Sequence, residues 1–149
     1  MRIPIAFVVS LVVVFVSGFD VTSADRVVAP KCAFETPVER LKTSKAVFSG
    51  EAIEVRESEG VQVVMFRVSR SWKNARVREI TVTNFVHHEG PYFQRGKRYL
   101  VYAYEQNGKL STGACSGTGE VEYAQDSIKQ LDKWSLRNKS RSSTSSKSL

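Results

Sequence analysis

The segment Phe93–Thr118 constrains the fold of this chain more than any other part of the sequence. It has the pattern of a strand over Arg98–Glu105, a turn at Asn107-Gly108 and a second strand over Leu110–Thr112. Asn-Gly is a strong hairpin signal, because both positions tolerate the positive φ angles of a tight turn. The second strand ends close to Cys115, so this hairpin is placed to carry one half of a long-range cross-link.

Residues 1–24 have the pattern of a secretory signal peptide. A basic start at Arg2 is followed by an apolar run over Ile3–Phe19 and by small residues up to Ala24. This order predicts cleavage after Ala24 and a secreted or otherwise extracytoplasmic protein, in the extracellular space or the periplasm. The alternative is an uncleaved membrane anchor, since the apolar run is at the short edge of what spans a bilayer.

Export bears directly on the two cysteines of the chain, Cys32 and Cys115. Disulfides persist in oxidising compartments, and two cysteines allow a single intramolecular pairing. Closing a loop of this length stabilises a fold by about 4 kcal/mol in the chain-entropy description. Two buried free thiols and an intermolecular bridge are the alternatives to a Cys32–Cys115 disulfide.

The remainder of the chain predicts one domain over residues 25–136, followed by a tail over 137–149. The net charge is +7, and the tail contributes Arg137, Lys139, Arg141 and Lys147 without any acid. The tail is otherwise rich in serine and has a single leucine, so we expect it to be disordered. Asn138 begins a glycosylation sequon, which is relevant in a eukaryotic secretory pathway.

Alternating apolar residues predict about five strands between a short helix and a terminal helix. Thr36, Pro37 and Glu39 have the spacing of a capping box with proline in the first turn. Gly50 within a strand pattern indicates a bulge or a sharp bend. Five short strands joined by a long cross-link favour a small closed barrel. The expected strands are 45–56, 61–72, 78–85, 98–105 and 110–112, with a short one at 119–123, and the terminal helix is 124–136.

No arrangement of residues predicts an enzyme, a metal site or a cofactor. His87-His88-Glu89 is the one histidine cluster, and we interpret it as solvated loop residues rather than metal ligands. The acids of the 51–59 segment are better explained as a solvated strand edge than as a catalytic pair. Cysteines held in a disulfide supply no thiolate nucleophile.

Basic residues are concentrated in one stretch that contains an aromatic residue and no acid. Cations interleaved with an aromatic ring suit a polyanion, and OB-fold barrels bind extended polymers on their faces and loops. The simpler interpretation, which we favour, is an ordinary solvated loop with the tryptophan in the core. The candidate binding residues are Arg67, Arg70, Trp72, Lys73, Arg76 and Arg78, with a second group at Arg95, Lys97 and Arg98.

Four segments in order resemble one known family. They are KAVFSGE (45–51), RSWK (70–73), FQRGKRYLVYA (93–103) and LSTGACSGT (110–118). Together they resemble netrin-like (NTR) domains, specifically secreted proteins similar to tissue inhibitors of metalloproteinases (TIMP-like). The resemblance covers roughly residues 32–131 and implies an OB-fold, which is a five-stranded Greek-key barrel with helices packed against it.

The resemblance also implies a function, and one departure from the family pattern bears on it. In the inhibitors, a free N-terminal cysteine chelates the protease zinc through its amine and carbonyl. Pro30 occupies that place here, inside the chain and without a free amine. We therefore expect a secreted, non-catalytic NTR/TIMP-like binding module that engages a protein or an anionic surface through barrel-end loops. Metalloproteinase inhibition is the alternative. The expected partner is a protein, such as an extracellular metalloprotease, or an anionic glycan or surface, and not a nucleic acid.

Overall fold

The computed structural model describes residues 32, 34–86 and 90–145, with side chains described as far as Lys139. All of them belong to one compact unit, Lys31–Leu149. The signal segment 1–24 and the cluster at 87–89 lie outside the described residues. Within the described part, no helix is long and apolar enough to cross a membrane.

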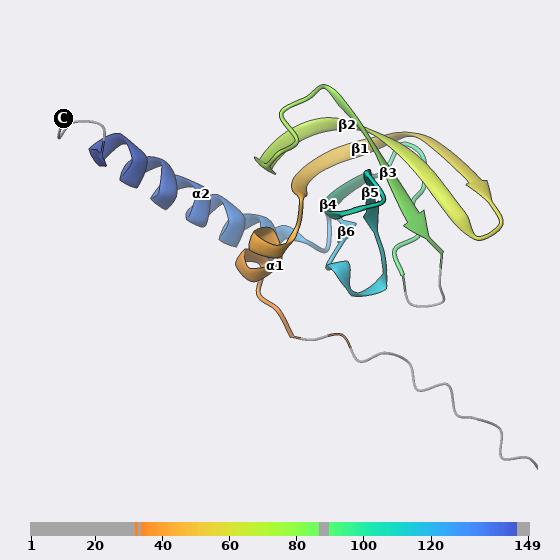
Figure 1. Cartoon of the computed structure of the whole chain (residues 1–149), viewed down its shortest axis with the longest axis horizontal. Helices are drawn as coiled ribbons and strands as arrows, with labels where there is room; N and C mark the ends of the chain where they lie inside the picture. Colours follow the sequence, from red (N-terminus) through yellow and green to blue (C-terminus); the bar gives the residue numbers. More distant parts are fainter. Residues whose placement is uncertain (1–31, 33, 87–89, 146–149) are drawn as a thin grey trace, which may run out of the picture. The chain divides into compact units, whose positions relative to one another are not determined.

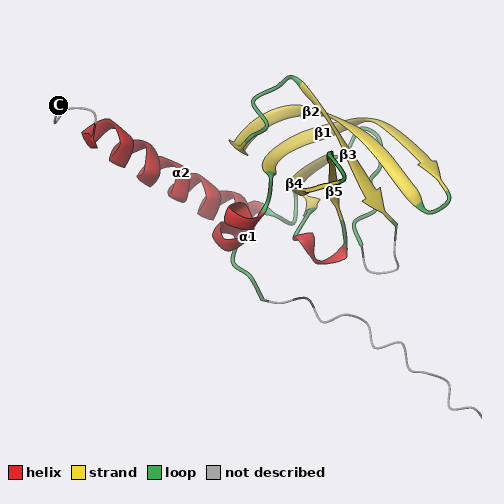
Figure 2. Cartoon of the chain, viewed as in Figure 1, coloured by secondary structure: helices red, strands yellow, loops and turns green. Residues whose placement is uncertain are grey.

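The strands form a closed five-stranded barrel with one short extra strand (Figures 1 and 2). The order around the barrel is β1-β2-β3-β5-β4, and pairing of β4 with β1 closes it. All of these pairings are antiparallel except the short β3–β5 pairing. The strands are β1 (Ala46–Ser58), β2 (Val61–Lys73), β3 (Glu79–Phe85), β4 (Arg98–Gln106), β5 (Lys109–Thr112) and β6 (Gly119–Glu120).

This architecture confirms the predicted fold class. The chain is mainly β and folds as an OB-fold-like barrel with a short helix before it and a helix after it. The predicted hairpin turn is also present, with positive φ angles at Asn107 (51°) and Gly108 (72°). Gly50 lies at a register shift between β1 and β2, as the bulge prediction requires.

Helix α1 (Pro37–Thr43) begins as the sequence predicts. The Thr36 hydroxyl accepts a hydrogen bond from the Glu39 amide at 3.3 Å, and a Glu39 carboxylate oxygen accepts one from the Thr36 amide at 2.7 Å. These two bonds satisfy amides at the start of the helix that have no partner within it. The bond from the Thr36 amide to the Glu39 carboxylate, and a second one from the Thr36 hydroxyl to the same oxygen at 2.9 Å, lower the pKa of the Glu39 carboxyl. The helix therefore has a fixed first turn.

Alternation along the strands separates two apolar clusters. The barrel interior centres on Phe66, whose ring makes edge-to-face contacts with Phe48, Phe93 and Tyr99 at centroid distances of 5.5, 5.2 and 6.2 Å. The outward side chains Val47, Leu100 and Tyr102 are buried too, because Leu41 of α1 and Leu131 of α2 cover them. The helices thus form a second layer over β1 and β4.

Helix α2 (Gln125–Ser145) is longer than the sequence predicts. The described backbone stays helical to Ser145, so disorder from residue 137 was the wrong expectation for 137–145. The physical reason is that no glycine or proline interrupts the chain after Gly119. Polar residues cannot form a core, yet a helix that is already nucleated and docked continues through them at little cost.

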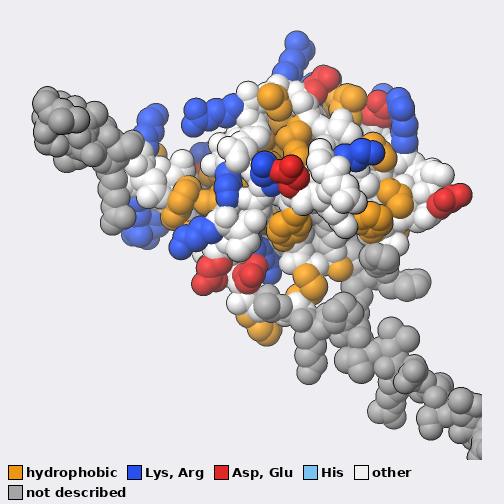
Figure 3. Space-filling view, viewed as in Figure 1, with side chains coloured by type: hydrophobic (Ala, Val, Ile, Leu, Met, Phe, Trp, Pro, Cys, Tyr) orange, Lys and Arg blue, Asp and Glu red, His pale blue; other side chains and the backbone are white. Residues whose placement is uncertain are grey.

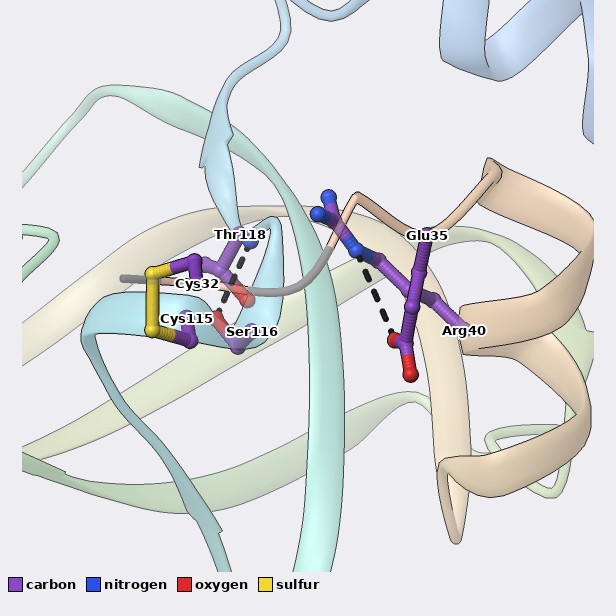
Figure 4. The surroundings of a disulfide bond; sticks show 6 residues. All are labelled: Cys32, Glu35, Arg40, Cys115, Ser116 and Thr118. Atoms are coloured by element: carbon purple, nitrogen blue, oxygen red, sulfur yellow. Dashed lines mark hydrogen bonds and ion pairs between the residues drawn. A yellow bond between two sulfur atoms is a disulfide. The ribbon is translucent and has the colours of Figure 1, made fainter. Parts of the chain in front are cut away.

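The predicted Cys32–Cys115 disulfide is present (Figure 4). It ties the segment before α1 to the short 3₁₀ helix η1 (Ala114–Ser116). Ser116 Oγ accepts a hydrogen bond from the Thr118 amide at 3.0 Å and from the Thr112 hydroxyl at the same distance, which fixes the loop beside the sulfur atoms. Among the described residues there is no free cysteine.

Candidate anion-binding site

The structure disperses the basic stretch that the sequence singled out. Arg67 lies in a cross-strand row of alternating charge, between Glu79 of β3 and Glu51 of β1. Its Nη1 atom is 3.8 Å from a carboxylate oxygen of Glu51. Opposite charges that face each other across strands stabilise a sheet. The charge of Arg67 is therefore offset by the neighbouring glutamates on the sheet surface. This agrees with the simpler of the two interpretations.

Lys73 has a structural role. Its Nζ atom donates to the carbonyl oxygens of Leu41 and Lys42, at 3.0 and 2.8 Å. Carbonyls at the end of a helix lack partners within the helix, and a lysine is a suitable donor for them. Arg76 and Arg78, in contrast, are exposed in the loop between β2 and β3.

Arg70 and Trp72 meet a residue of α2. Asp132 Oδ1 accepts a hydrogen bond from Trp72 Nε1 at 2.8 Å and pairs with Arg70 Nη2 at 2.8 Å. The Arg70 guanidinium also lies over the Trp72 ring, 5.3 Å from its centroid. Trp72 is packed against the helix layer, as the core interpretation predicted. Its contacts hold Arg70 in a fixed position with half of its side chain exposed to solvent.

Arg70 borders an open pocket of about 400 Å³ between the barrel wall and the start of α2. A second arginine, Arg98 of β4, lines the same pocket, and the hydroxyls of Ser49 and Ser69 lie 3.3 Å apart in its wall. We call it the Arg70–Arg98 pocket. Its lining residues are Ser49, Ser69, Arg70, Trp72, Arg98, Val121, Gln125 and Ile128.

The chemistry of the Arg70–Arg98 pocket favours an anion. Two of the lining residues are arginines and none of them is acidic, so the lining carries a positive charge. Asp132 pairs with Arg70, and Glu120 and Glu122 share a neighbouring opening with Arg98. Guanidinium groups bind carboxylate, sulfate and phosphate oxygens through paired N–H donors. The Ser69 hydroxyl donates to the Ser49 carbonyl oxygen at 3.0 Å, so Ser69 forms part of the pocket wall and supplies no donor to a ligand. Glu51 is the register partner of Arg98, but the ion pair that Glu51 forms is with Arg67 on the other neighbouring strand. Arg98 is therefore available to a ligand.

The sequence pattern places Arg70 and Trp72 in the candidate group. It does not indicate that Ser49 and Ser69 lie beside them, or that Arg98 lines the same pocket as Arg70. Arg98 was noted only as part of a separate basic group. The two arginines come together because β1 pairs with β2 on one side and with β4 on the other. That closure of the barrel has no local signal in the sequence.

The described part of the chain contains no group of three or more histidine, cysteine, aspartate or glutamate side chains placed to hold a metal ion. The histidine cluster at 87–89 lies outside it. No protein-family model matches the sequence, and a search of curated proteins finds no match.

Proposed function

We propose that this protein is an exported, non-catalytic binding module of NTR/TIMP-like character that holds an anionic group of its partner in the Arg70–Arg98 pocket. The observation that carries the proposal is the convergence of two arginines from different strands on one open pocket, with one of them fixed by Asp132 and Trp72. A pre-positioned guanidinium loses little side-chain entropy when it binds an anion.

The nature of the partner follows from the predicted compartment. An exported protein meets acidic glycans and acidic protein surfaces rather than intracellular nucleic acid. OB-fold barrels accommodate oligosaccharides, and the net charge of +7 favours encounter with a polyanion. An anionic glycan is the partner that these features suit best.

Heparin affinity tests the proposal. We expect Arg98→Gln to lower the affinity for heparin about tenfold, since a hydrogen bond to a charged group contributes about 1.5–3 kcal/mol and 1.4 kcal/mol is tenfold. Arg56→Gln is the matched control, because Arg56 is exposed at the far end of β1 and paired with Glu54. Titration calorimetry measures both. Equal losses in the two variants would show that binding follows total charge and would reject the pocket.

Metalloproteinase inhibition gains no support from the geometry of the described residues. The family mechanism needs a free amine on an N-terminal cysteine. In this chain Cys32 follows Pro30 and Lys31, and its sulfur is bonded to Cys115.

A further inference from the structure

A second opening adjoins the Arg70–Arg98 pocket near the start of α2. Arg98 and Val121 line both of them, so the two lie side by side. The second opening has a volume of about 420 Å³, and its lining residues are Lys97, Arg98, Glu120, Val121 and Glu122. We call it the Glu120–Glu122 opening. Both volumes are within the range of small-ligand sites, about 300–1,000 Å³.

The backbone around the Glu120–Glu122 opening is held by the barrel. Strand β6 pairs with β4 through Glu120 and Tyr99, and the Val121 amide donates to the Arg98 carbonyl oxygen at 2.9 Å. The Ala124 amide donates to the Glu120 carbonyl oxygen at 3.1 Å, in the turn that leads into α2. The two openings therefore have a fixed backbone before a ligand arrives, which reduces the entropy lost on binding.

The charge of the Glu120–Glu122 opening differs from that of the pocket. Lys97 Nζ is 2.8 Å from a carboxylate oxygen of Glu120, so these two charges offset each other. Glu122 is exposed, and it takes part in none of the ion pairs among the described residues. Apart from Arg98, which it shares with the pocket, the opening therefore carries one excess negative charge.

A positive pocket beside a negative opening selects a ligand with one charged and one neutral unit. A negative group in the pocket pairs with Arg98 and with the exposed part of Arg70. A second negative group in the opening would be repelled by Glu122, whereas a neutral unit donates hydroxyl or amide hydrogen bonds to that carboxylate. Acidic and basic side chains are also interspersed on the barrel face drawn in Figure 3. A ligand that is charged at every unit would meet both signs of charge there.

We propose that the two openings together bind a disaccharide of an acidic glycan in which charged and neutral sugars alternate. The acidic sugar lies in the Arg70–Arg98 pocket. A neutral N-acetylhexosamine lies in the Glu120–Glu122 opening, where Glu122 accepts a hydrogen bond from its amide or from a hydroxyl. Val121, half-buried and shared by the two openings, offers an apolar contact to the sugar rings. This inference rests on the proposed function and deepens it, because it names the class of glycan.

Tetrasaccharides of hyaluronan and of galacturonan are the test ligands. Hyaluronan alternates a uronic acid with N-acetylglucosamine, whereas every unit of the galacturonide carries a carboxylate. We expect titration calorimetry to show about threefold tighter binding of hyaluronan. Repulsion by one exposed like charge changes affinity by up to about fivefold, and general attraction to a protein of charge +7 offsets part of that. General attraction alone predicts the opposite order, so equal or tighter binding of the galacturonide would overturn the inference.

The variant Glu122→Gln tests the source of the preference. Removal of this carboxylate should raise the affinity for the galacturonide by up to about fivefold, and the affinity for hyaluronan should change less than about twofold, because glutamine still accepts a hydrogen bond. Glu59→Gln is the matched control. It makes the same change of charge at an exposed residue in the turn between β1 and β2, and Glu59 lines neither opening. Equal effects of the two variants would show that the preference follows total charge and would reject the role of Glu122.

Arg98→Gln separates this inference from the proposed function. We expect it to weaken both tetrasaccharides about tenfold, because Arg98 lines both openings. If it changes neither these affinities nor that for heparin, the proposed function fails. If Arg98 is required and hyaluronan is not preferred, only the choice of an alternating glycan fails. A peptide of alternating glutamate and alanine that competes as well as the hyaluronan tetrasaccharide would overturn the choice of a saccharide.

Discussion

The side chain of Tyr102 carries a buried hydroxyl. The residue is 1% exposed beneath the helix layer, and its oxygen has no hydrogen-bond partner among the described residues. Burial raises the pKa of Tyr102 to about 12. Tyr99, buried in the barrel interior, differs in one respect: its hydroxyl accepts from the Gln94 amide at 2.9 Å. The two tyrosines form a matched pair for asking what a buried hydroxyl contributes.

We expect Tyr102→Phe to retain or raise the free energy of unfolding at neutral pH, by up to about 1–3 kcal/mol, because an unsatisfied buried hydroxyl is costly. Tyr99→Phe should lower it by about 1 kcal/mol through loss of its hydrogen bond. Denaturant titration measures both. A loss in Tyr102→Phe as large as that in Tyr99→Phe would contradict the assignment.

The same pair predicts a difference at alkaline pH. An unfolded tyrosine ionises near its ordinary pKa of 10, whereas folded Tyr102 ionises near 12, so the fold favours the neutral phenol. The stability from this difference is complete below pH 10 and is lost as pH rises from 10 to 12. Tyr102→Phe should therefore weaken the alkaline loss of stability. Burial also raises the pKa of Tyr99 and of Tyr104, so part of the loss remains.

At the scale of elements, the docking of α2 onto β2 depends on Asp132. Its carboxylate accepts from Trp72 Nε1 and pairs with Arg70. We expect Asp132→Ala to lower the free energy of unfolding by about 2 kcal/mol, since hydrogen bonds to a charged group contribute about 1.5–3 kcal/mol. Asp126→Ala is the control, because Asp126 is 90% exposed and its pair with Lys129 is a surface one. Chemical denaturation followed by tryptophan fluorescence measures both, and similar losses in the two variants would argue against this role of Asp132.

Elements with a local cause could be predicted from the sequence. Asn107-Gly108 forms the predicted turn, and the capping box at Thr36 begins the predicted helix. Gly50 is at the predicted bulge, where a Cβ atom would lie 2.7 Å from the carbonyl oxygen of Arg67. In each case residues a few positions apart determine the backbone, so the pattern contains the necessary information.

Contacts between distant elements could not be predicted in the same way. Trp72 and Asp132 are sixty residues apart, and nothing local to either indicates the other. Gln62 fits the strand pattern, which gives no sign of a special role. In the structure its side chain is fully buried and forms hydrogen bonds with both the amide and the carbonyl of Phe93. The Arg70–Arg98 pocket depends on contacts of the same type, because its lining comes from strands that closure of the barrel brings together and from the docked helix α2. The candidate site therefore needed the structure, whereas the fold class did not.

At the scale of the whole molecule, the disulfide is separate from the proposed binding pocket. Cys115 lies in η1, and neither it nor Cys32 lines the Arg70–Arg98 pocket. The cross-link closes a loop that contains α1 and the whole barrel. A restraint of this kind acts chiefly on the unfolded chain, by reducing its conformational freedom. Stability and ligand affinity should therefore respond differently to its removal.

We expect Cys32→Ser/Cys115→Ser to lower the free energy of unfolding by about 4 kcal/mol and to leave the affinity for heparin unchanged at temperatures where the variant is folded. The physical reason is that the barrel contacts that shape the pocket do not involve the sulfur atoms. Differential scanning calorimetry with and without a reducing agent gives the stability, and titration calorimetry gives the affinity. Reduction should lower the melting temperature of the wild-type protein and have no effect on the double variant. An unchanged wild-type melting temperature would exclude a stabilising disulfide, whereas a loss of heparin affinity in the folded variant would show that the cross-link also shapes the binding surface.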